Sequence, residues 1–275
     1  MNLLIAGGDA RFAFAAEEGT RRGLRVTVLG LEKAGGRFRR GRLSDAAEAD
    51  AVILANPWRG QLPGPMDQSG VAADRLLDNL NPGAKLFLPD DTAKPASFAR
   101  PYIKPDEAYL LANARLTAEG AVSALMARSD FALAGERALV IGWGRIAKSL
   151  CPLLRGLGAN VCAAARRAQA REEAHAAGYL TCGMDEISTC LGAFRLIVNT
   201  VPAQVLGEGE LRLVRREAVL IDVASAPFGF SLESAEKLGL KAARESGLPG
   251  RYCSRTAGCV LLDAALRAFE REGLR

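Results

Sequence analysis

Short apolar runs alternate with amphipathic segments from one end of the chain to the other. In the first half, runs that are brief and apolar on both faces predict parallel strands at residues 2–6, 25–29, 51–54 and 85–88. Segments with apolar residues at helical spacing predict helices at residues 11–22 and 71–80. This alternation is typical of an α/β domain whose sheet is covered by helices.

The second half repeats the pattern more regularly. Strands are predicted at residues 137–141, 160–164, 195–199 and 218–223, with helices at 145–157 and 168–177. Between the halves, Pro89, Pro95, Pro101 and Pro105 interrupt regular structure, and residues 106–128 read as one long helix. The pattern therefore predicts two Rossmann-like, doubly wound parallel-sheet domains that this helix joins.

The end of the chain predicts one more helix, because residues 257–272 carry apolar side chains at helical spacing. By analogy with two-domain proteins of this layout, we expect that helix to return to the first domain. The first domain then comprises residues 1–105 together with about 255–275. Residues 106–128 form the linking helix, and 129–254 form a dinucleotide-binding domain.

Composition narrows the functional classes. The 275 residues are 49% hydrophobic and carry a net charge of +5, with basic side chains spread along the chain, which favours small anionic ligands over nucleic acid. No apolar run approaches the roughly 18 residues of a membrane span, and no secretory leader is apparent, so we expect a cytoplasmic protein. Six scattered cysteines without a C-x-x-C pair, and the single His175 in a polar helical segment, predict that no metal is bound.

The strongest motif is a G-x-G-x-x-A turn that follows a predicted strand and opens a predicted helix. It comprises Gly142, Trp143, Gly144, Arg145, Ile146 and Ala147. Such a turn lets the backbone approach a pyrophosphate at the N-terminus of the helix. The alternative is a glycine turn without a ligand.

The next strand end bears on the choice of cofactor. An NAD site usually has an acid there for the ribose hydroxyl, whereas this chain has Arg166 and Arg167. Because guanidinium groups bind phosphate with paired hydrogen bonds, the sequence predicts NADP (NADPH). The alternative is a pair of solvated arginines.

Polar residues also follow two later strands. Asn199, Thr200 and Pro202 follow one of them, and Asp222 and Ser225 follow the other. Ligands of open α/β sheets lie at the carboxyl ends of the strands, so these residues are expected to border the nicotinamide. Local turn and cap roles are the alternative.

A second glycine turn, Gly7-Gly8-Asp9-Ala10-Arg11, follows the first predicted strand. It lacks the third small residue in register and a later acid or arginine cluster, so it predicts a site for a different anion or polar ligand. The alternative role for Asp9 is a simple helix N-cap.

Seven segments in series resemble the family of dipicolinate synthase A subunits, in order and spacing, over essentially the whole chain. They are Gly7-Gly8-Asp9-Ala10-Arg11, Thr117-Ala118-Glu119-Gly120, the turn at 142–147, Asn199-Thr200-Val201-Pro202, Asp222-Val223-Ala224-Ser225, Gly247-Leu248-Pro249-Gly250 and Thr256-Ala257-Gly258. The sequence departs from the family at Ala226 and Phe228, where Lys and Gly are usual, and at Arg255, where Lys is usual.

The resemblance implies a two-domain oxidoreductase with a nicotinamide cofactor, similar in architecture to D-2-hydroxyacid dehydrogenases. It implies that the protein, with a flavoprotein-like B subunit, converts a dihydrodipicolinate-type precursor to pyridine-2,6-dicarboxylate in the mother cell of a spore-forming bacterium. A D-2-hydroxyacid dehydrogenase reaction itself is disfavoured, because it needs a histidine near the cleft and His175 lies elsewhere. A nucleotide-binding regulatory or scaffolding subunit remains an alternative, and a homo-oligomer is also left open.

A dicarboxylate substrate needs cations or N–H donors at both ends, and we expect it in the interdomain cleft. Arg11 and Arg255 are the predicted carboxylate ligands. Glu119 or Asp222 is the candidate for proton transfer. The hydrogen-bonding groups expected around the substrate are those of Asp9, Asn113, Thr117, Ser225 and Thr256.

Overall fold

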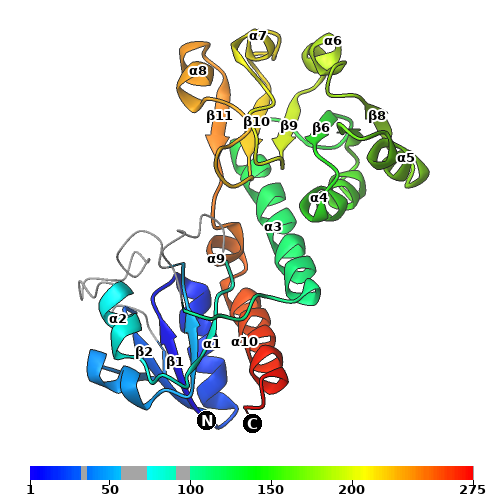
Figure 1. Ribbon diagram of the computed structural model, residues 1–275. Coiled ribbons are helices and arrows are strands. Elements are labelled where there is room, and N and C mark those ends of the chain that lie inside the picture. The colour runs from blue at the N-terminus through cyan, green and yellow to red at the C-terminus, as the bar shows by residue number, and fades with distance from the viewer. Residues whose placement is uncertain (32–35, 57–72, 91–99, 275) are drawn as a thin grey trace. The chain divides into compact units, whose positions relative to one another are not determined.

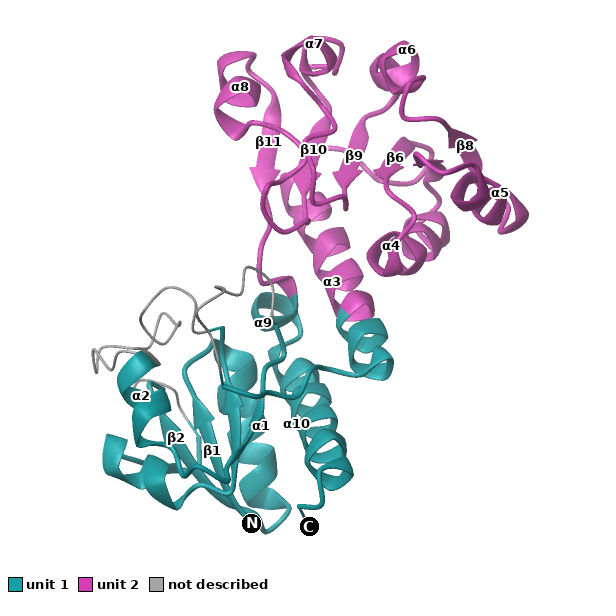
Figure 2. Ribbon diagram, in the orientation of Figure 1, with its two compact units in different colours: residues 1–113, 249–275 teal, residues 114–248 magenta. Residues whose placement is uncertain are grey.

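The structure is a computed structural model that describes residues 1–31, 36–56, 73–90 and 100–274. The chain forms two compact units (Figure 2). Unit 1 comprises Met1–Asn113 and Pro249–Arg275, and unit 2 comprises Ala114–Leu248. The chain therefore leaves unit 1 within one long helix and returns to it near its end.

Unit 1 contains a parallel five-stranded sheet in the order β3-β2-β1-β4-β5. Its strands are β1 Asn2–Ala6, β2 Arg25–Leu29, β3 Arg39–Arg40, β4 Ala51–Leu54 and β5 Lys85–Phe87. Alternate side chains of β1 enter different cores: Leu3 and Ile5 pack with helices α1 (Ala10–Arg21) and α10 (Ser254–Arg271), whereas Leu4 and Ala6 pack with η1 (Leu43–Glu48) and α2 (Ala73–Asn79). Helices thus cover both faces of the sheet (Figure 1).

Unit 2 contains a parallel six-stranded sheet in the order β11-β10-β9-β6-β7-β8. The strands are β6 Arg137–Ile141, β7 Asn160–Ala164, β8 Leu180–Cys182, β9 Leu196–Asn199, β10 Val219–Asp222 and β11 Lys241–Arg244. The helices are α3 Glu107–Arg128, which begins in unit 1, α4 Arg145–Gly156, α5 Ala168–Ala176, α6 Ile187–Cys190, α7 Glu208–Leu211, α8 Leu232–Lys237 and α9 Leu248–Tyr252, which ends in unit 1, with η2 at Leu191–Ala193. The strand order reverses between β6 and β9, which is the switch point at which ligands bind in such sheets.

The predicted fold class is confirmed, including the return of the last helix to the first domain. The strands that the pattern missed are β3, β8 and β11, and each lies at the edge of a sheet. Edge strands are partly solvated, and their sequences (Arg39-Arg40, Leu180 to Cys182 and Lys241 to Arg244) lack the buried apolar run that marks a central strand. Of the predicted helix at 71–80, residues 71 and 72 lie outside the described residues, as does Pro95.

Helices α1 and α10 pack closely because Gly258 has no side chain. A Cβ atom there would lie 2.6 Å from the Arg11 carbonyl oxygen and 2.6 Å from Phe14 Cβ. These are atoms of a neighbouring helix that cannot move without displacing its backbone. The Thr256-Ala257-Gly258 motif thus has a packing role at its glycine.

None of the helices within the described residues combines the length and apolar character that crossing a bilayer requires. Within the same residues, no three His, Cys, Asp or Glu side chains are grouped as metal ligands would be.

We expect Gly258→Ala to lower the free energy of unfolding of unit 1 by about 1–3 kcal/mol, since the added methyl group overpacks the helix contact. The matched control is Gly156→Ala at the end of α4, where a Cβ atom would meet no atom within 4 Å. That variant should be as stable as the parent chain or up to about 1 kcal/mol more stable. Differential scanning calorimetry measures both, and an unchanged transition in Gly258→Ala would contradict the packing role.

Candidate functional site

The glycine turn after β6 is held against the loop after β9. Gly142 has φ +107°, a conformation that favours glycine, and its N–H donates to the Ala164 carbonyl at 2.8 Å. A Cβ atom there would lie 2.5 Å from Thr200 Oγ1. The Thr200 hydroxyl in turn donates to the Ile141 carbonyl at 2.8 Å. Thr200 therefore shapes the turn.

The N-terminus of α4 is open. Gly144 is its N-cap residue, no side chain caps the helix, and a Cβ atom on Gly144 would meet nothing within 4 Å. The N–H of Lys148 makes the first helical bond, to the Gly144 carbonyl at 2.9 Å, so the preceding N–H groups have no partner within the helix. Free N–H groups and the positive end of the helix dipole fit a diphosphate.

Side chains within the turn mainly pack. The Trp143 ring lies edge-on against Tyr179, with ring centroids 5.7 Å apart, and Ile146 packs against the core of unit 2. Ala147 is fully buried between helix and sheet. The side chains of Trp143 and Ile146 are therefore used in packing, and only their backbone can contact a cofactor. The Arg145 side chain is exposed.

Two arginines are free at the end of β7. Arg166 and Arg167 are exposed, and neither guanidinium group forms an ion pair or hydrogen bond with any described residue. The loop that carries them is fixed by Arg171 of α5, whose Nη1 donates to the carbonyls of Ala165 at 3.0 Å and Arg166 at 2.9 Å. Sequence reasoning missed Arg171, because the motif ends before it.

Asn199 and Asp222 form a fully buried pair at the ends of β9 and β10. Asn199 Nδ2 donates to Asp222 Oδ1 at 2.9 Å and to the Val201 carbonyl at 2.9 Å. The Asp222 carboxylate also accepts the N–H of Ala224 at 3.0 Å and the N–H of Gly229 at 2.6 Å. Three donors therefore satisfy this carboxylate, and no solvent reaches it.

This environment changes the role that we assign to Asp222. A buried carboxylate with all its donors in place fixes the loops around it and has no open path for a proton. The alternative interpretation, local backbone capping, describes both Asn199 and Asp222 better than contact with a nicotinamide.

Phe228 occupies a strained position in the loop after β10. Its φ is +70°, in the left-handed region that favours glycine. The Arg244 guanidinium lies 3.6 Å from the centroid of its ring. Ser225, in the same loop, and Pro202, in the loop after β9, are exposed, and the Ser225 hydroxyl makes no hydrogen bond to a described residue.

In unit 1, Asp9 both caps α1 and binds Arg11. Asp9 Oδ1 accepts the Arg11 N–H at 3.0 Å, so the N-cap interpretation is correct. The Arg11 guanidinium donates from Nε to Oδ1 at 2.9 Å and from Nη2 to Oδ2 at 2.8 Å. Gly250 of α9 lies against the same carboxylate, since a Cβ atom there would be 2.6 Å from Oδ2. Asp9 is thus held in place on two sides and fixes the direction of Arg11.

Arg255 has different surroundings from Arg11. Its guanidinium lies 5.0 Å from the centroid of the Phe14 ring, and it lines a surface pocket of about 400 Å³ between α1 and α10. Arg255 and Thr256 are both exposed. No described contact joins Arg255 to Arg11, so their joint binding of one substrate stays a prediction.

The predicted residues of α3 are divided between the units. Asn113 lies at the end of the unit 1 portion, whereas Thr117 and Glu119 belong to unit 2. Thr117 is buried and Glu119 is exposed.

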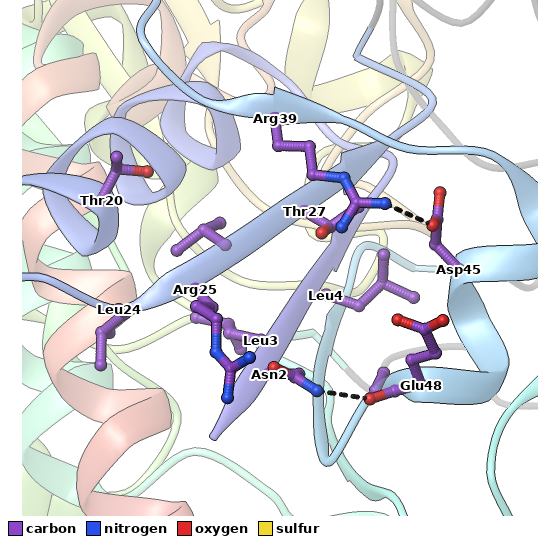
Figure 3. A pocket seen from close by; sticks show the side chains of 12 residues that line it. Asn2, Leu3, Leu4, Thr20, Leu24, Arg25, Thr27, Arg39, Asp45 and Glu48 are labelled. Carbon is purple, nitrogen blue, oxygen red and sulfur yellow. Dashed lines mark hydrogen bonds and ion pairs between the residues drawn. The ribbon is translucent and has the colours of Figure 1, made fainter.

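A second pocket in unit 1, of about 330 Å³, lies beside the first residues of β1 and β2 (Figure 3). Asn2, Arg25, Arg39, Asp45 and Glu48 supply its polar wall, and Arg39 is paired with Asp45 at 2.7 Å. It contains the amino ends of the strands, whereas Asp9 and Arg11 follow the carboxyl end of β1. The pocket is therefore separate from the candidate site.

Comparison with known proteins agrees with this geometry. Residues 111–228 match the family model of the D-isomer specific 2-hydroxyacid dehydrogenase NAD-binding domain. The A subunit of dipicolinate synthase from Bacillus subtilis (strain 168) is 31% identical over 150 residues, which are 53% of this chain and 49% of that protein. The chain thus matches about half the length of this curated relative.

Two crystal structures share the fold. The dipicolinate synthase A subunit from Bacillus halodurans has a TM-score of 0.85 at 23% identity, covering 97% of this chain and 96% of that one. The corresponding chain of dipicolinate synthase from Bacillus subtilis has a TM-score of 0.83 at 23% identity, covering 99% and 97%. The resemblance that the motifs indicate is confirmed.

If Asp222 is structural, Asp222→Asn should lower the free energy of unfolding of unit 2 by about 2–3 kcal/mol, because an amide N–H₂ would face a backbone N–H. Ser225→Ala, on the exposed part of the same loop, should change it by less than about 0.5 kcal/mol. Urea unfolding followed by circular dichroism compares them. Equal stability of the two variants would return Asp222 to the candidates for proton transfer.

Proposed function

We propose that this chain, which resembles the A subunit of dipicolinate synthase, is an NADP-dependent oxidoreductase that forms dipicolinate (pyridine-2,6-dicarboxylate) from a dihydrodipicolinate-type precursor. Making the ring aromatic removes one hydride and one proton. NADP⁺, when bound, accepts the hydride, and the proton passes to a base or to solvent. The observation that carries the proposal is the uncapped N-terminus of α4 together with two exposed arginines, in the loop after the neighbouring strand β7, that form no ion pair with a described residue.

NADP is preferred in this proposal because of charge. The backbone around Gly142 and Gly144 would bind the diphosphate, and Arg166 and Arg167 would bind the 2′-phosphate that NAD lacks. Arg171 holds the loop that carries them through the carbonyls of Ala165 and Arg166. A preformed loop loses less entropy when the phosphate binds.

We propose that polar residues of both units bind the substrate. Arg11, oriented by Asp9, binds a carboxylate. Arg255 contributes positive charge, and Asn113, Thr117, Ser225 and Thr256 are proposed as hydrogen-bonding groups. The burial of Asp222 leaves Glu119, which is exposed on α3, as the proposed group for proton transfer.

The proposed setting follows the resemblance as well. A flavoprotein-like B subunit would act with this chain, in the cytoplasm of the mother cell of a spore-forming bacterium. Association of the chain with itself is compatible with the proposal.

A regulatory or scaffolding subunit is the second candidate function. It is favoured by one observation, namely that the Asp222 carboxylate is fully buried and satisfied by its own loops. In that case the chain binds the nucleotide and the partner carries out the chemistry.

The deciding experiment measures NADPH formation by the isolated chain, supplied with the dihydro precursor, against the chain with its B subunit. Turnover by the isolated chain that falls at least tenfold in Glu119→Gln supports the enzyme. Turnover only with the partner present, and unchanged in Glu119→Gln, supports the scaffold.

Cofactor choice can be tested by titration. Arg166→Ala and Arg167→Ala should each weaken NADP binding about 10-fold or more, because each removes a charge-assisted contact, and should leave NAD binding within about 2-fold. The control is Arg216→Ala, another exposed arginine of unit 2 without an ion pair to a described residue. Equal affinity of the unmodified chain for NADP and NAD would contradict the proposed preference.

A further inference from the structure

The pocket beside the first residues of β1 and β2 is a cavity of unit 1 that the proposed function does not use (Figure 3). Its volume of about 330 Å³ falls within the range of small-molecule sites, roughly 300–1,000 Å³. It lies at the amino ends of the strands, whereas the turn that carries Asp9 and Arg11 follows the carboxyl end of β1. At roughly 3.3 Å per residue, the length of β1 separates the two places by about 16 Å. A small molecule in this pocket therefore does not contact Arg11.

The deeper part of the pocket is apolar. Leu3, Leu4 and Val26 line it and are at most 5% exposed, and Leu24 is half-buried beside them. Little of this apolar surface remains open to the cavity. It therefore suits a short aliphatic group better than a large ring.

Two polar contacts fix the shape of the rim. Asn2 Nδ2 donates to the Glu48 carbonyl at 3.0 Å, and Arg39 Nη2 donates to Asp45 Oδ1 at 2.7 Å. Figure 3 shows these contacts above and below the Leu4 side chain. The backbone N–H of Asn2 also donates to Asp50 Oδ2 at 2.7 Å. Asn2 is thus held by its backbone and its side chain, and its Oδ1 atom remains as an acceptor.

Two opposite charges in this pocket are unmatched. The Arg25 guanidinium and the Glu48 carboxylate both line the cavity, and Figure 3 shows them on either side of Asn2. Neither group forms an ion pair or a side-chain hydrogen bond with any described residue, and they do not pair with each other. One ligand that carries both a negative and a positive charge can satisfy both groups.

We propose that this pocket binds a free α-amino acid with an aliphatic side chain. Arg25 binds the α-carboxylate through paired hydrogen bonds. The Glu48 carboxylate and Asn2 Oδ1 accept from the α-ammonium group, which has only donors to offer. The aliphatic chain lies against Leu24 and the apolar lining. The inference goes beyond the proposed function and does not depend on it.

The charges of the rim disfavour other classes of ligand. A phosphate or a dicarboxylate would bring a second negative charge against the carboxylates of Glu48 and Asp45. A diamine would bring a second positive charge against Arg25 and Arg39. Pyridine-2,6-dicarboxylate is therefore not expected to bind here.

The test is a titration of the full chain with L-leucine, followed by nuclear magnetic resonance, which also measures weak binding. Arg25→Gln and Glu48→Gln should each weaken binding about 10-fold, because each removes a charge-assisted contact. Their melting temperatures should stay unchanged, since neither side chain is paired with a described residue. The matched controls are Arg75→Gln and Glu270→Gln, which change exposed residues of unit 1 outside the pocket and should bind leucine as the parent chain does.

Analogues of leucine assign one charge to each residue. Leucinamide keeps the ammonium group and lacks the carboxylate, whereas N-acetylleucine keeps the carboxylate and lacks the ammonium group. Each should bind the parent chain about 10-fold more weakly than leucine does. Leucinamide binding should be unaffected by Arg25→Gln, and N-acetylleucine binding should be unaffected by Glu48→Gln. Glycine should bind about 10-fold more weakly than leucine, because it has no side chain to cover the apolar lining.

Several results would overturn the inference. Leucine could fail to bind at millimolar concentration, or it could bind equally well to the parent chain, Arg25→Gln and Glu48→Gln. Glycine that binds as tightly as leucine would show that the aliphatic class is wrong. Displacement of leucine by pyridine-2,6-dicarboxylate would make the pocket a carboxylate site instead. None of these results changes the cofactor preference or the turnover on which the proposed function depends.

Discussion

The buried carboxylate of Asp222 imposes the constraint on which the candidate cofactor site depends. A charge removed from water has to be matched by donors, and here three donors come from Asn199 at the end of β9, from Ala224 just after β10, and from Gly229. Meeting that requirement holds the loops after β9 and β10 together. The β9 loop in turn contacts the glycine turn through Thr200, so the opening at α4 keeps its shape because of a charge that no ligand touches.

The two units use the same turn for different purposes. Both have a glycine-rich turn between the first strand and a helix. In unit 1 the turn supplies its own anion, since Asp9 occupies the N-terminus of α1. In unit 2 the cap is Gly144, which leaves the N-terminus of α4 for an anion from outside. One side chain at the cap position therefore decides whether such a turn is self-satisfied or able to bind a phosphate.

Some parts of the fold and of the candidate site can be predicted from the sequence, and others cannot. Apolar runs predict the central strands, because a strand covered on both faces has to be apolar throughout. The order strand, turn, helix predicts the nucleotide-binding turn around Gly142. The pattern cannot tell a buried structural Asp222 from a catalytic one, since both types follow a strand. Arg171 carries no motif either, because its partners are two loop carbonyls that only the folded chain brings near.

The two arginines assigned to carboxylates are not equivalent in physical terms. Asp9 binds Arg11 along one edge of its guanidinium, so the direction of the remaining donors is set by the fold. Arg255 rests on the face of Phe14 at 5.0 Å, a contact that constrains direction far less, and its exposed position lets it sample other rotamers. Binding a ligand therefore costs less side-chain conformational entropy at Arg11 than at Arg255. Arg11 is accordingly the residue suited to fix the orientation of a carboxylate, whereas Arg255 is suited to attract it.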